Sequence, residues 1–298
     1  MNATDLIGNT PMVDLGTLVG KPSVGLLAKV EGNNPGGSVK DRAALWMVKE
    51  AEARGDLTPG MRLVEATSGN TGIALAMIAA MKGYAIDLVM PDNATAERVL
   101  AMRAYGANVI LTPRSRQMEG AIDVARERAL DANTLMLDQF KNPDNYRAHE
   151  STTAPEIWRE TRGAISHFVS AMGTTGTIMG CSRFFKSKRA AIQIVGVQPE
   201  DGAQIPGIRR WPSAYLPKIF DSSRVDRVID IGRDAATAMS RRLAKTLGLS
   251  CGMSSGGAVA AALRLCDELD EGLVITVLCD RGDRYLSSDL FADDEPER

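Results

Sequence analysis

The sequence is poor in several residue types on which whole classes of protein chemistry depend. Its only cysteines are Cys181, Cys251, Cys266 and Cys279. None of them forms a C-x-x-C pair, so neither a disulfide framework nor a structural zinc site is expected, and a reducing cytoplasm fits this content. The only histidines are His149 and His167, which excludes chemistry that needs several imidazoles.

The sequence also lacks an excess of charge of either sign. Its 35 basic and 37 acidic residues leave a formal net charge of −2, whereas nucleic-acid binders usually concentrate basic charge on one face. No charged-then-apolar leader opens the chain, and no apolar run approaches the roughly 20 residues that span a bilayer. Small metabolites are therefore the expected partners, rather than nucleic acids or membranes.

What the chain does contain is a regular alternation of β-rich runs and helical segments, which predicts an α/β protein with largely parallel sheets. The predicted strands are residues 26–30, 63–66, 86–90, 108–112, 135–138, 167–170, 193–198 and 273–278. The predicted helices are residues 39–54, 72–82, 94–105, 118–130, 145–161, 175–188, 234–247 and 255–269. Residues 199–226 are rich in proline and lack periodicity, which indicates an ordered excursion rather than a linker.

Three turns built from small residues follow predicted strands or open helices. In open α/β sheets, ligands bind where strand ends and helix N-termini converge. The first turn, residues 67–72, reads Thr-Ser-Gly-Asn-Thr-Gly and could hold a carboxylate by its backbone N–H groups. An N-capped helix start explains one Ser or Thr but not this whole run of small polar residues.

The second turn, residues 173–177, reads Gly-Thr-Thr-Gly-Thr and resembles a phosphate cup, because its glycines let oriented amides surround an anion. It has neither the Gly-Lys-Ser/Thr ending of a nucleotide P-loop nor the G-x-G-x-x-G spacing, which disfavours ATP and NAD. The third turn, residues 252–257, is on its own an ordinary helix cap.

Lys40 stands at the first turn of a predicted helix, within the segment Ser-Val-Lys-Asp-Arg at residues 38–42. The helix dipole disfavours a cation there. The same field, together with burial, lowers the pKa of the amine and favours Schiff-base chemistry. Most lysines are nevertheless surface residues, so Lys40 alone does not predict a site.

Together, these segments resemble the cysteine synthase family in their order and spacing. That family belongs to fold type II of the pyridoxal-phosphate enzymes. The resemblance extends from residues 7–11 to residues 284–287. It is strongest to the B isozyme of the family, through residues 31–35, 205–211 and 279–284. It implies a two-domain, tryptophan synthase β-like α/β fold, with parallel-rich twisted sheets flanked by helices.

The resemblance implies pyridoxal 5'-phosphate as the cofactor, with Lys40 binding it covalently and later removing the substrate α-proton. Asn70 is expected to hydrogen-bond the ring hydroxyl oxygen of the cofactor, and Ser254 is expected to face its pyridine nitrogen. The residues expected to hold the phosphate are Gly173, Thr174, Thr175, Gly176 and Thr177. Those expected to bind the substrate carboxylate are Thr67, Ser68, Gly69, Thr71 and Gln139.

The tandem pair Arg209 and Arg210 can be interpreted in two ways. Surface exposure is the commonest fate of arginine, but between two prolines one guanidinium could stand at the mouth of the site. There it would pair with an anionic sulfur donor or a phosphorylated substrate, and we expect this role for one of the two. Cys279 ends a predicted strand, where an inert buried thiol and a minor pocket-lining role are equally expected.

The resemblance further implies a smaller mobile domain, residues 35–145, carrying Lys40 and Asn70. A larger domain, residues 1–34 and 146–298, would carry the phosphate cup and Ser254, and substrate binding is expected to draw the two together. The expected reaction replaces the acetate of O-acetylserine with sulfide or thiosulfate, giving cysteine or S-sulfocysteine, in a homodimer. The alternatives are a cystathionine β-synthase, a serine/threonine dehydratase or a non-catalytic scaffold.

Overall fold

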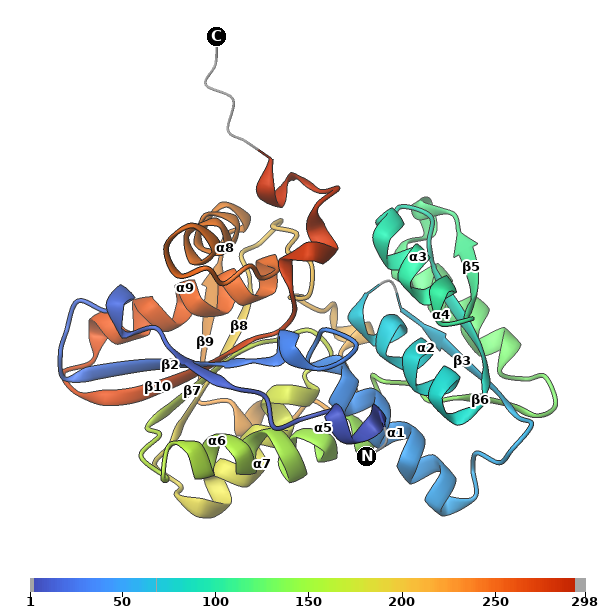
Figure 1. Cartoon of the computed structure of the whole chain (residues 1–298), viewed down its shortest axis with the longest axis horizontal. Coiled ribbons are helices and arrows are strands. Elements are labelled where there is room, and N and C mark those ends of the chain that lie inside the picture. Colours follow the sequence, from blue (N-terminus) through green and yellow to red (C-terminus); the bar gives the residue numbers. More distant parts are fainter. Residues whose placement is uncertain (1–2, 68, 293–298) are drawn as a thin grey trace, which may run out of the picture.

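The computed structural model describes residues 3–67 and 69–292 (Figure 1). Its strands are β1 Met12–Asp14, β2 Val24–Val30, β3 Arg62–Ala66, β4 Ala85–Pro91, β5 Asn108–Thr112, β6 Thr134–Met136, β7 His167–Ala171, β8 Gln193–Pro199, β9 Arg227–Ile231 and β10 Gly272–Leu278. Its α-helices are α1 Lys40–Arg54, α2 Asn70–Lys82, α3 Ala96–Ala104, α4 Gln117–Arg128, α5 Asp144–Ala148, α6 Ala154–Glu160, α7 Gly176–Lys188, α8 Arg233–Leu247 and α9 Met253–Glu268. The predicted α/β fold is confirmed.

The strands form two sheets. The larger has the order β1-β2-β10-β7-β8-β9, and only its edge strand β1 runs antiparallel to its neighbour. The smaller has the order β5-β4-β3-β6 and is parallel throughout. Parallel strands need helical crossovers, so both sheets are covered by helices on their two faces.

Alternation along the strands divides the core into layers. In the smaller sheet, Leu63 of β3 packs with α1 and α2, whereas Val64 packs with α4 on the opposite face. In the larger sheet, Val169 of β7 faces α8 and α9, and Phe168 faces α7. Successive side chains of a strand point to opposite faces, and near-continuous apolar runs result when both faces are buried.

Three details of the predicted elements were wrong. The strand β1 was missed because three residues are too few to show a period, and β9 was missed although it directly follows the proline-rich segment. β9 is an edge strand with three exposed positions, so its sequence resembles a loop. The predicted helix 145–161 is interrupted by a π-helical turn, His149–Thr153, between α5 and α6.

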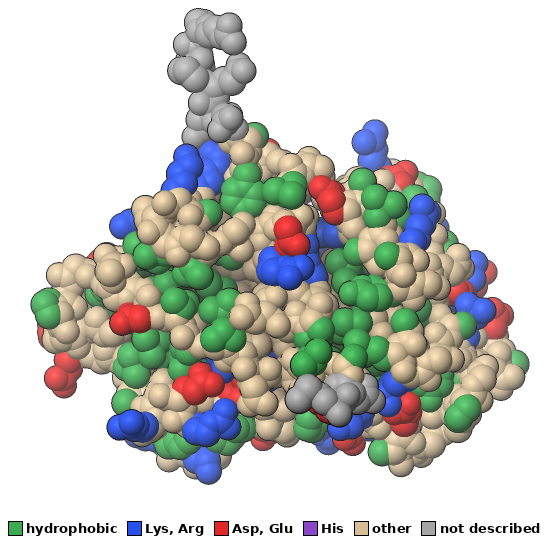
Figure 2. Space-filling view, in the orientation of Figure 1, with side chains coloured by type: hydrophobic (Ala, Val, Ile, Leu, Met, Phe, Trp, Pro, Cys, Tyr) green, Lys and Arg blue, Asp and Glu red, His purple; other side chains and the backbone are tan. Residues whose placement is uncertain are grey.

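Acidic and basic side chains are interspersed over the face shown in Figure 2, in keeping with the small net charge. No helix in the described residues is both long and apolar enough to cross a membrane.

Candidate active site

A cavity of about 1050 Å³ lies where the carboxyl ends of both sheets meet. The segments that follow β3, β4, β7, β8 and β10 all contribute residues to its lining. Parallel strands place their carboxyl ends on one edge of a sheet, so loops far apart in sequence converge there. The cavity therefore occupies the position at which open α/β sheets bind ligands.

Lys40 begins α1 and lines this cavity. Among the described residues its Nζ has no hydrogen-bond or ion-pair partner, although its backbone N–H donates to Ser38 Oγ at 3.3 Å. Burial lowers the pKa of Lys40, and the weaker influences of Cys279, Asp280 and Glu31 oppose that change. An amine with a lowered pKa and no partner is poised to attack a carbonyl carbon.

The phosphate cup predicted at residues 173–177 joins β7 to α7, and four of its residues line the cavity: Gly173, Thr174, Thr175 and Thr177. Thr175 has φ +69°, which is strained for a β-branched residue. Its Oγ1 is buried and has no partner among the described residues. A buried hydroxyl without a partner is costly, and a phosphate oxygen at this helix N-terminus would satisfy it. The cup therefore fits the cofactor phosphate.

The glycines of the cup are also constrained by neighbouring protein atoms, and their role in binding the phosphate stays a prediction. A Cβ on Gly173 would come within 2.7 Å of Gly207 O, and a Cβ on Gly176 would collide with Asn145 Oδ1. Both glycines are therefore required by neighbouring protein atoms. Gly176 begins α7 and does not itself line the cavity.

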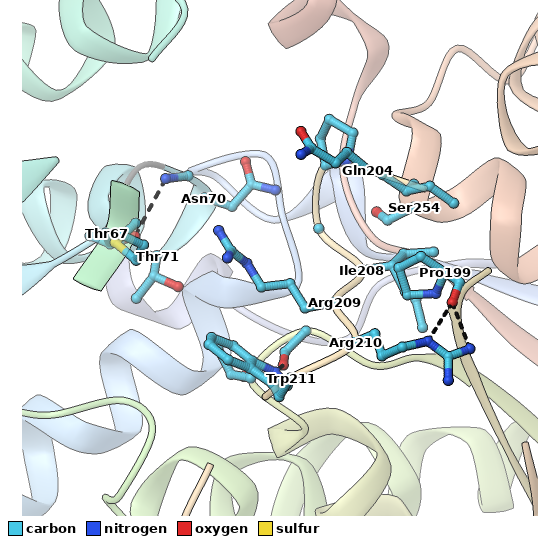
Figure 3. Close-up of a pocket in the computed structure, with 18 of the residues that line it drawn as sticks. Thr67, Asn70, Thr71, Pro199, Gln204, Ile208, Arg209, Arg210, Trp211 and Ser254 are labelled. Carbon is cyan, nitrogen blue, oxygen red and sulfur yellow. Dashed lines mark hydrogen bonds between the residues drawn. The ribbon is translucent and has the colours of Figure 1, made fainter. Parts of the chain in front are cut away.

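Asn70 and Ser254 approach the cavity from the two sheets (Figure 3). The side chain of Asn70 donates from Nδ2 to Asp280 Oδ2 at 2.6 Å and accepts from Arg284 Nη1. Ser254 lies in the first turn of α9 and is buried. Their proposed contacts with the cofactor stay predictions, but both side chains are brought to the same cavity as Lys40.

Cys279 follows β10 and also lines the cavity. Its backbone N–H donates to Ser255 Oγ at 2.9 Å, and burial raises the pKa of its thiol to about 11. A thiol with a raised pKa is a poor nucleophile at neutral pH. The position agrees with pocket lining and gives no sign of a reactive cysteine.

Four of the five residues predicted to bind the substrate carboxylate line the cavity, namely Thr67, Gly69, Thr71 and Gln139. The hydroxyl of Thr71 donates to Gln139 Oε1 at 2.7 Å, so the turn after β3 and the loop after β6 are connected. The fifth residue, Ser68, lies outside the described residues.

The two tandem arginines point in different directions (Figure 3). Arg209 extends into the cavity toward Thr71 and lies against the Trp211 ring, with its Cζ 5.2 Å from the ring centroid. Partial burial lowers the pKa of Arg209, and the negative charge of Glu119 opposes this change. Arg210 instead donates twice to Pro199 O, at 3.1 and 2.9 Å, and pairs with Asp201 and Asp230. Arg209 is thus the one of the two whose guanidinium is available to a ligand.

Two residues that hold the site together were missed. Trp211 donates from Nε1 to Gly173 O at 2.8 Å and packs edge-on against Phe140, at 5.2 Å between ring centroids. Asn145 donates from Nδ2 to Gln139 O at 2.7 Å and to Thr174 Oγ1 at 3.3 Å. Trp211 belongs to segment 205–211, which carried the B-isozyme resemblance, so the sequence could have pointed to it. Asn145 is an asparagine within a helix, and no feature of the sequence distinguishes it as a site residue.

Comparison with known proteins agrees with this geometry. A family model described as pyridoxal-phosphate dependent enzyme matches residues 3–280. Cysteine synthase B of Pseudomonas aeruginosa is 59% identical over 287 residues, which cover 96% of this chain and 96% of that protein. The chain belongs to the cysteine synthase family of pyridoxal-phosphate-dependent enzymes. The predicted family and cofactor are confirmed.

Solved structures of cysteine synthase-type enzymes share the fold over nearly the whole length. An O-ureido-L-serine synthase superposes with a TM-score of 0.93 at 38% identity, covering 99% of this chain and 97% of that one. A cysteine synthase from Entamoeba histolytica superposes with a TM-score of 0.92 at 37% identity, covering 99% of this chain and 92% of that one. The two neighbours carry different synthase names, so the acceptor substrate must be argued from the cavity itself.

Proposed function

We propose that the protein is a cysteine synthase that replaces the acetate of O-acetyl-L-serine with sulfide or thiosulfate. The observation that carries the proposal is the environment of Lys40, an unpaired amine of lowered pKa that shares one cavity with a phosphate cup. The high identity to a cysteine synthase B supports the choice of reaction within the family. The products would be acetate and either L-cysteine or S-sulfocysteine.

The residues of the cavity divide the work of the reaction between them. When bound, pyridoxal phosphate withdraws electrons and makes the substrate α-proton acidic. In this proposal the Lys40 amine carries the cofactor between turnovers and takes the α-proton during elimination. Thr67, Gly69, Thr71 and Gln139 bind the substrate carboxylate, and Ser68 completes that set. The Ser254 hydroxyl faces the pyridine nitrogen, and Asn70 faces the ring oxygen.

A closing motion is part of the proposal. The sheet β5-β4-β3-β6 lies within residues 35–145 and carries the carboxylate-binding turn, whereas the other sheet carries the cup. We assign these residues to a smaller mobile domain, and residues 1–34 and 146–298 to the larger. Glu97 of α3 accepts from Ser287 N at 2.9 Å and from Ser287 Oγ at 2.6 Å, which links the two parts beside the cavity. Closure would exclude water from the reacting atoms.

Arg209 is proposed to select the sulfur donor. Its guanidinium has no carboxylate partner among the described residues, and it points toward Thr71 in the cavity that both residues line (Figure 3). A planar guanidinium matches the oxygens of a dianion such as thiosulfate, whereas sulfide needs no such partner. Phosphoserine would be recognised by the same chemistry.

The working form is proposed to be a homodimer in the cytoplasm. Closed twofold symmetry is the commonest state of soluble oligomers. All four cysteines are unpaired, which suits a reducing compartment.

Addition of O-acetylserine to the purified yellow protein tests the function. The visible absorption of the lysine-bound cofactor should change on adding O-acetylserine and return on adding sulfide, with one cysteine formed for each acetate released. A response to serine or threonine with release of ammonia would instead identify a dehydratase. Product formation only with homocysteine would identify a cystathionine β-synthase, and a spectrum that ignores all of these would identify a scaffold.

A further inference from the structure

Glu65 is a buried carboxylate that the proposed mechanism does not use. It is the penultimate residue of β3 and is 1% exposed. Within the described part of the chain, no lysine or arginine forms an ion pair with it. A buried acidic group without a cation is unfavourable unless its oxygens are otherwise satisfied. Its partners should therefore explain why it is there.

Those partners are two successive backbone amides of the loop after β6. Glu65 Oε2 accepts from Asp138 N at 2.9 Å, and Oε1 accepts from Gln139 N at 3.2 Å. Asp138 has φ +53°, a left-handed conformation that is uncommon outside glycine. In such a conformation, successive N–H groups can converge on a single anion. The carboxylate of Glu65 thus compensates for the strained backbone at Asp138.

The loop whose amides donate to Glu65 carries Gln139, and two hydrogen bonds orient the Gln139 side chain. Its Oε1 accepts from Thr71 Oγ1 at 2.7 Å, and its Nε2 donates to Ala66 O at 3.3 Å. The backbone carbonyl of Gln139 accepts from Asn145 Nδ2, which also donates to Thr174 Oγ1 of the cup. A displacement of the loop would move Gln139 relative to both the carboxylate-binding turn and the cup.

We propose that Glu65 is a positioning residue for recognition of the amino-acid carboxylate, acting through the backbone amides of residues 138 and 139 to hold Gln139 opposite Thr71. The inference rests on the proposed role of Gln139 in substrate binding. Burial raises the pKa of Glu65 to about 8, and the two amide hydrogen bonds act against that rise. The geometry of two donated N–H groups suits the carboxylate form.

The substitution that tests this proposal is Glu65→Gln in the holoenzyme. The amide NH₂ of glutamine cannot accept a hydrogen bond, so one of the two loop amides would face a donor instead of an acceptor. We expect the half-saturating concentration of O-acetylserine in the spectral titration to rise about ten- to hundredfold, the effect of leaving one buried N–H of the loop without an acceptor. The affinity for pyridoxal phosphate and the rate of the sulfide step should stay at wild-type values. Asp226→Asn is the matched control, because Asp226 also accepts a backbone N–H, from Ile194 at 2.7 Å, but does not line the cavity.

Coupling to Gln139 separates positioning from simple support of the fold. If Glu65 acts through Gln139, adding Glu65→Gln to Gln139→Ala should raise the half-saturating concentration by less than about twofold beyond Gln139→Ala alone. The loss of affinity in Glu65→Gln should also appear with L-serine and not with L-serine amide, which has no carboxylate. An unchanged half-saturation in Glu65→Gln, an additive double variant, or equal losses with serine and its amide would overturn the proposal. If Glu65→Gln does not fold, Glu65→Asp, whose carboxylate reaches less far, undergoes the same three comparisons and decides the proposal.

Failure of the proposed function would look different. A wild-type protein that responds to L-serine but ignores O-acetylserine would refute the cysteine synthase assignment. The comparison of Glu65→Gln with wild type would then be made on L-serine and would still decide the role of Glu65.

Discussion

Two cations stand two residues apart at the start of α1, and the structure treats them in opposite ways. Arg42 is 2% exposed and donates to Glu31 Oε2 at 2.7 Å and to Glu156 Oε1 at 2.7 Å. Lys40 is half-buried at the cavity, yet its Nζ has no such partner among the described residues. Residues i and i+2 lie on nearly opposite sides of a helix. One side of α1 therefore faces the cavity and the other faces the interior.

The difference shows in the protonation of the two groups. Burial acts to lower the pKa of Arg42, but Glu31 and Glu156 outweigh it and raise the pKa. At Lys40, burial dominates and the pKa is lowered. A buried cation with carboxylate partners stabilises the framework, whereas a cation without partners at a cavity is available for chemistry.

The framework on the Arg42 side extends through three elements. Lys29 of β2 is fully buried and donates to Glu160 Oε1 at 2.8 Å, and it pairs with Glu156 Oε2 at 3.1 Å. Together with Arg42, these contacts tie β2 and α6 to the first turn of α1. The helix end that presents Lys40 is thus anchored by charges on its opposite side.

The largest expected effect comes from removing the unpaired cation. Lys40→Ala should lose the yellow lysine-bound cofactor and reduce kcat/KM for cysteine formation by more than about a thousandfold, since nucleophile and base are lost together. The fold should persist because Nζ has no hydrogen bond or ion pair to lose among the described residues. Absorbance, turnover and circular dichroism check these expectations, with the exposed Lys49→Ala as control. Wild-type turnover in Lys40→Ala would refute the role of Lys40.

Removing the paired cation should have the opposite result. Arg42→Met leaves the buried carboxylates of Glu31 and Glu156 with reduced compensation, so the free energy of unfolding should fall by about 3–5 kcal/mol. Urea denaturation of cofactor-bound protein measures it. The control is Arg227→Met, whose pair with Glu268 is exposed on both sides and should contribute less than about 1 kcal/mol. Equal losses for the two variants would remove the distinction drawn between buried and exposed pairs.

Much of the Lys40 side of this comparison could be predicted from the sequence, and almost none of the Arg42 side. The turns at residues 67–72 and 173–177 were recognisable because local composition marks a strand end. The partners of Arg42 lie 11 and 114 residues away in the chain, and no local pattern connects them. The same holds for Glu65, whose acceptor role depends on a loop 73 and 74 residues further on.

The choice between Arg209 and Arg210 was also beyond the sequence. The two are adjacent, and only the position of Asp201, Asp230 and Pro199 O decides which guanidinium is occupied. The π-helical turn at His149–Thr153 was hidden for a similar reason, because its residues continue the helical pattern on both sides.

The same contrast between unpaired and paired cations recurs at Arg209 and Arg210, with a smaller expected effect. Arg209→Ala should reduce kcat/KM for thiosulfate by about ten- to hundredfold, the effect of one or two charged hydrogen bonds, and change sulfide use little. Arg210→Ala is the matched control and should leave the ratio of the two donors unchanged. Equal losses with both donors in Arg209→Ala would assign this arginine to the amino-acid substrate or to the fold.

The smallest expected effect is a shift in the pH at which Lys40 becomes reactive. Because burial lowers its pKa, the neutral amine is present at lower pH than for a lysine in water, and only the neutral amine attacks an aldehyde. Cofactor-free protein is incubated with pyridoxal phosphate and a mild hydride reductant across a pH series, and each labelled lysine is quantified by mass spectrometry. Labelling of Lys40 should reach its half-maximum at a lower pH than labelling of the exposed Lys49. Asp280→Asn should move the Lys40 midpoint lower still, since the carboxylate of Asp280 opposes the effect of burial. A Lys40 midpoint at or above that of Lys49 would show that its lack of a partner does not make it a stronger nucleophile at neutral pH.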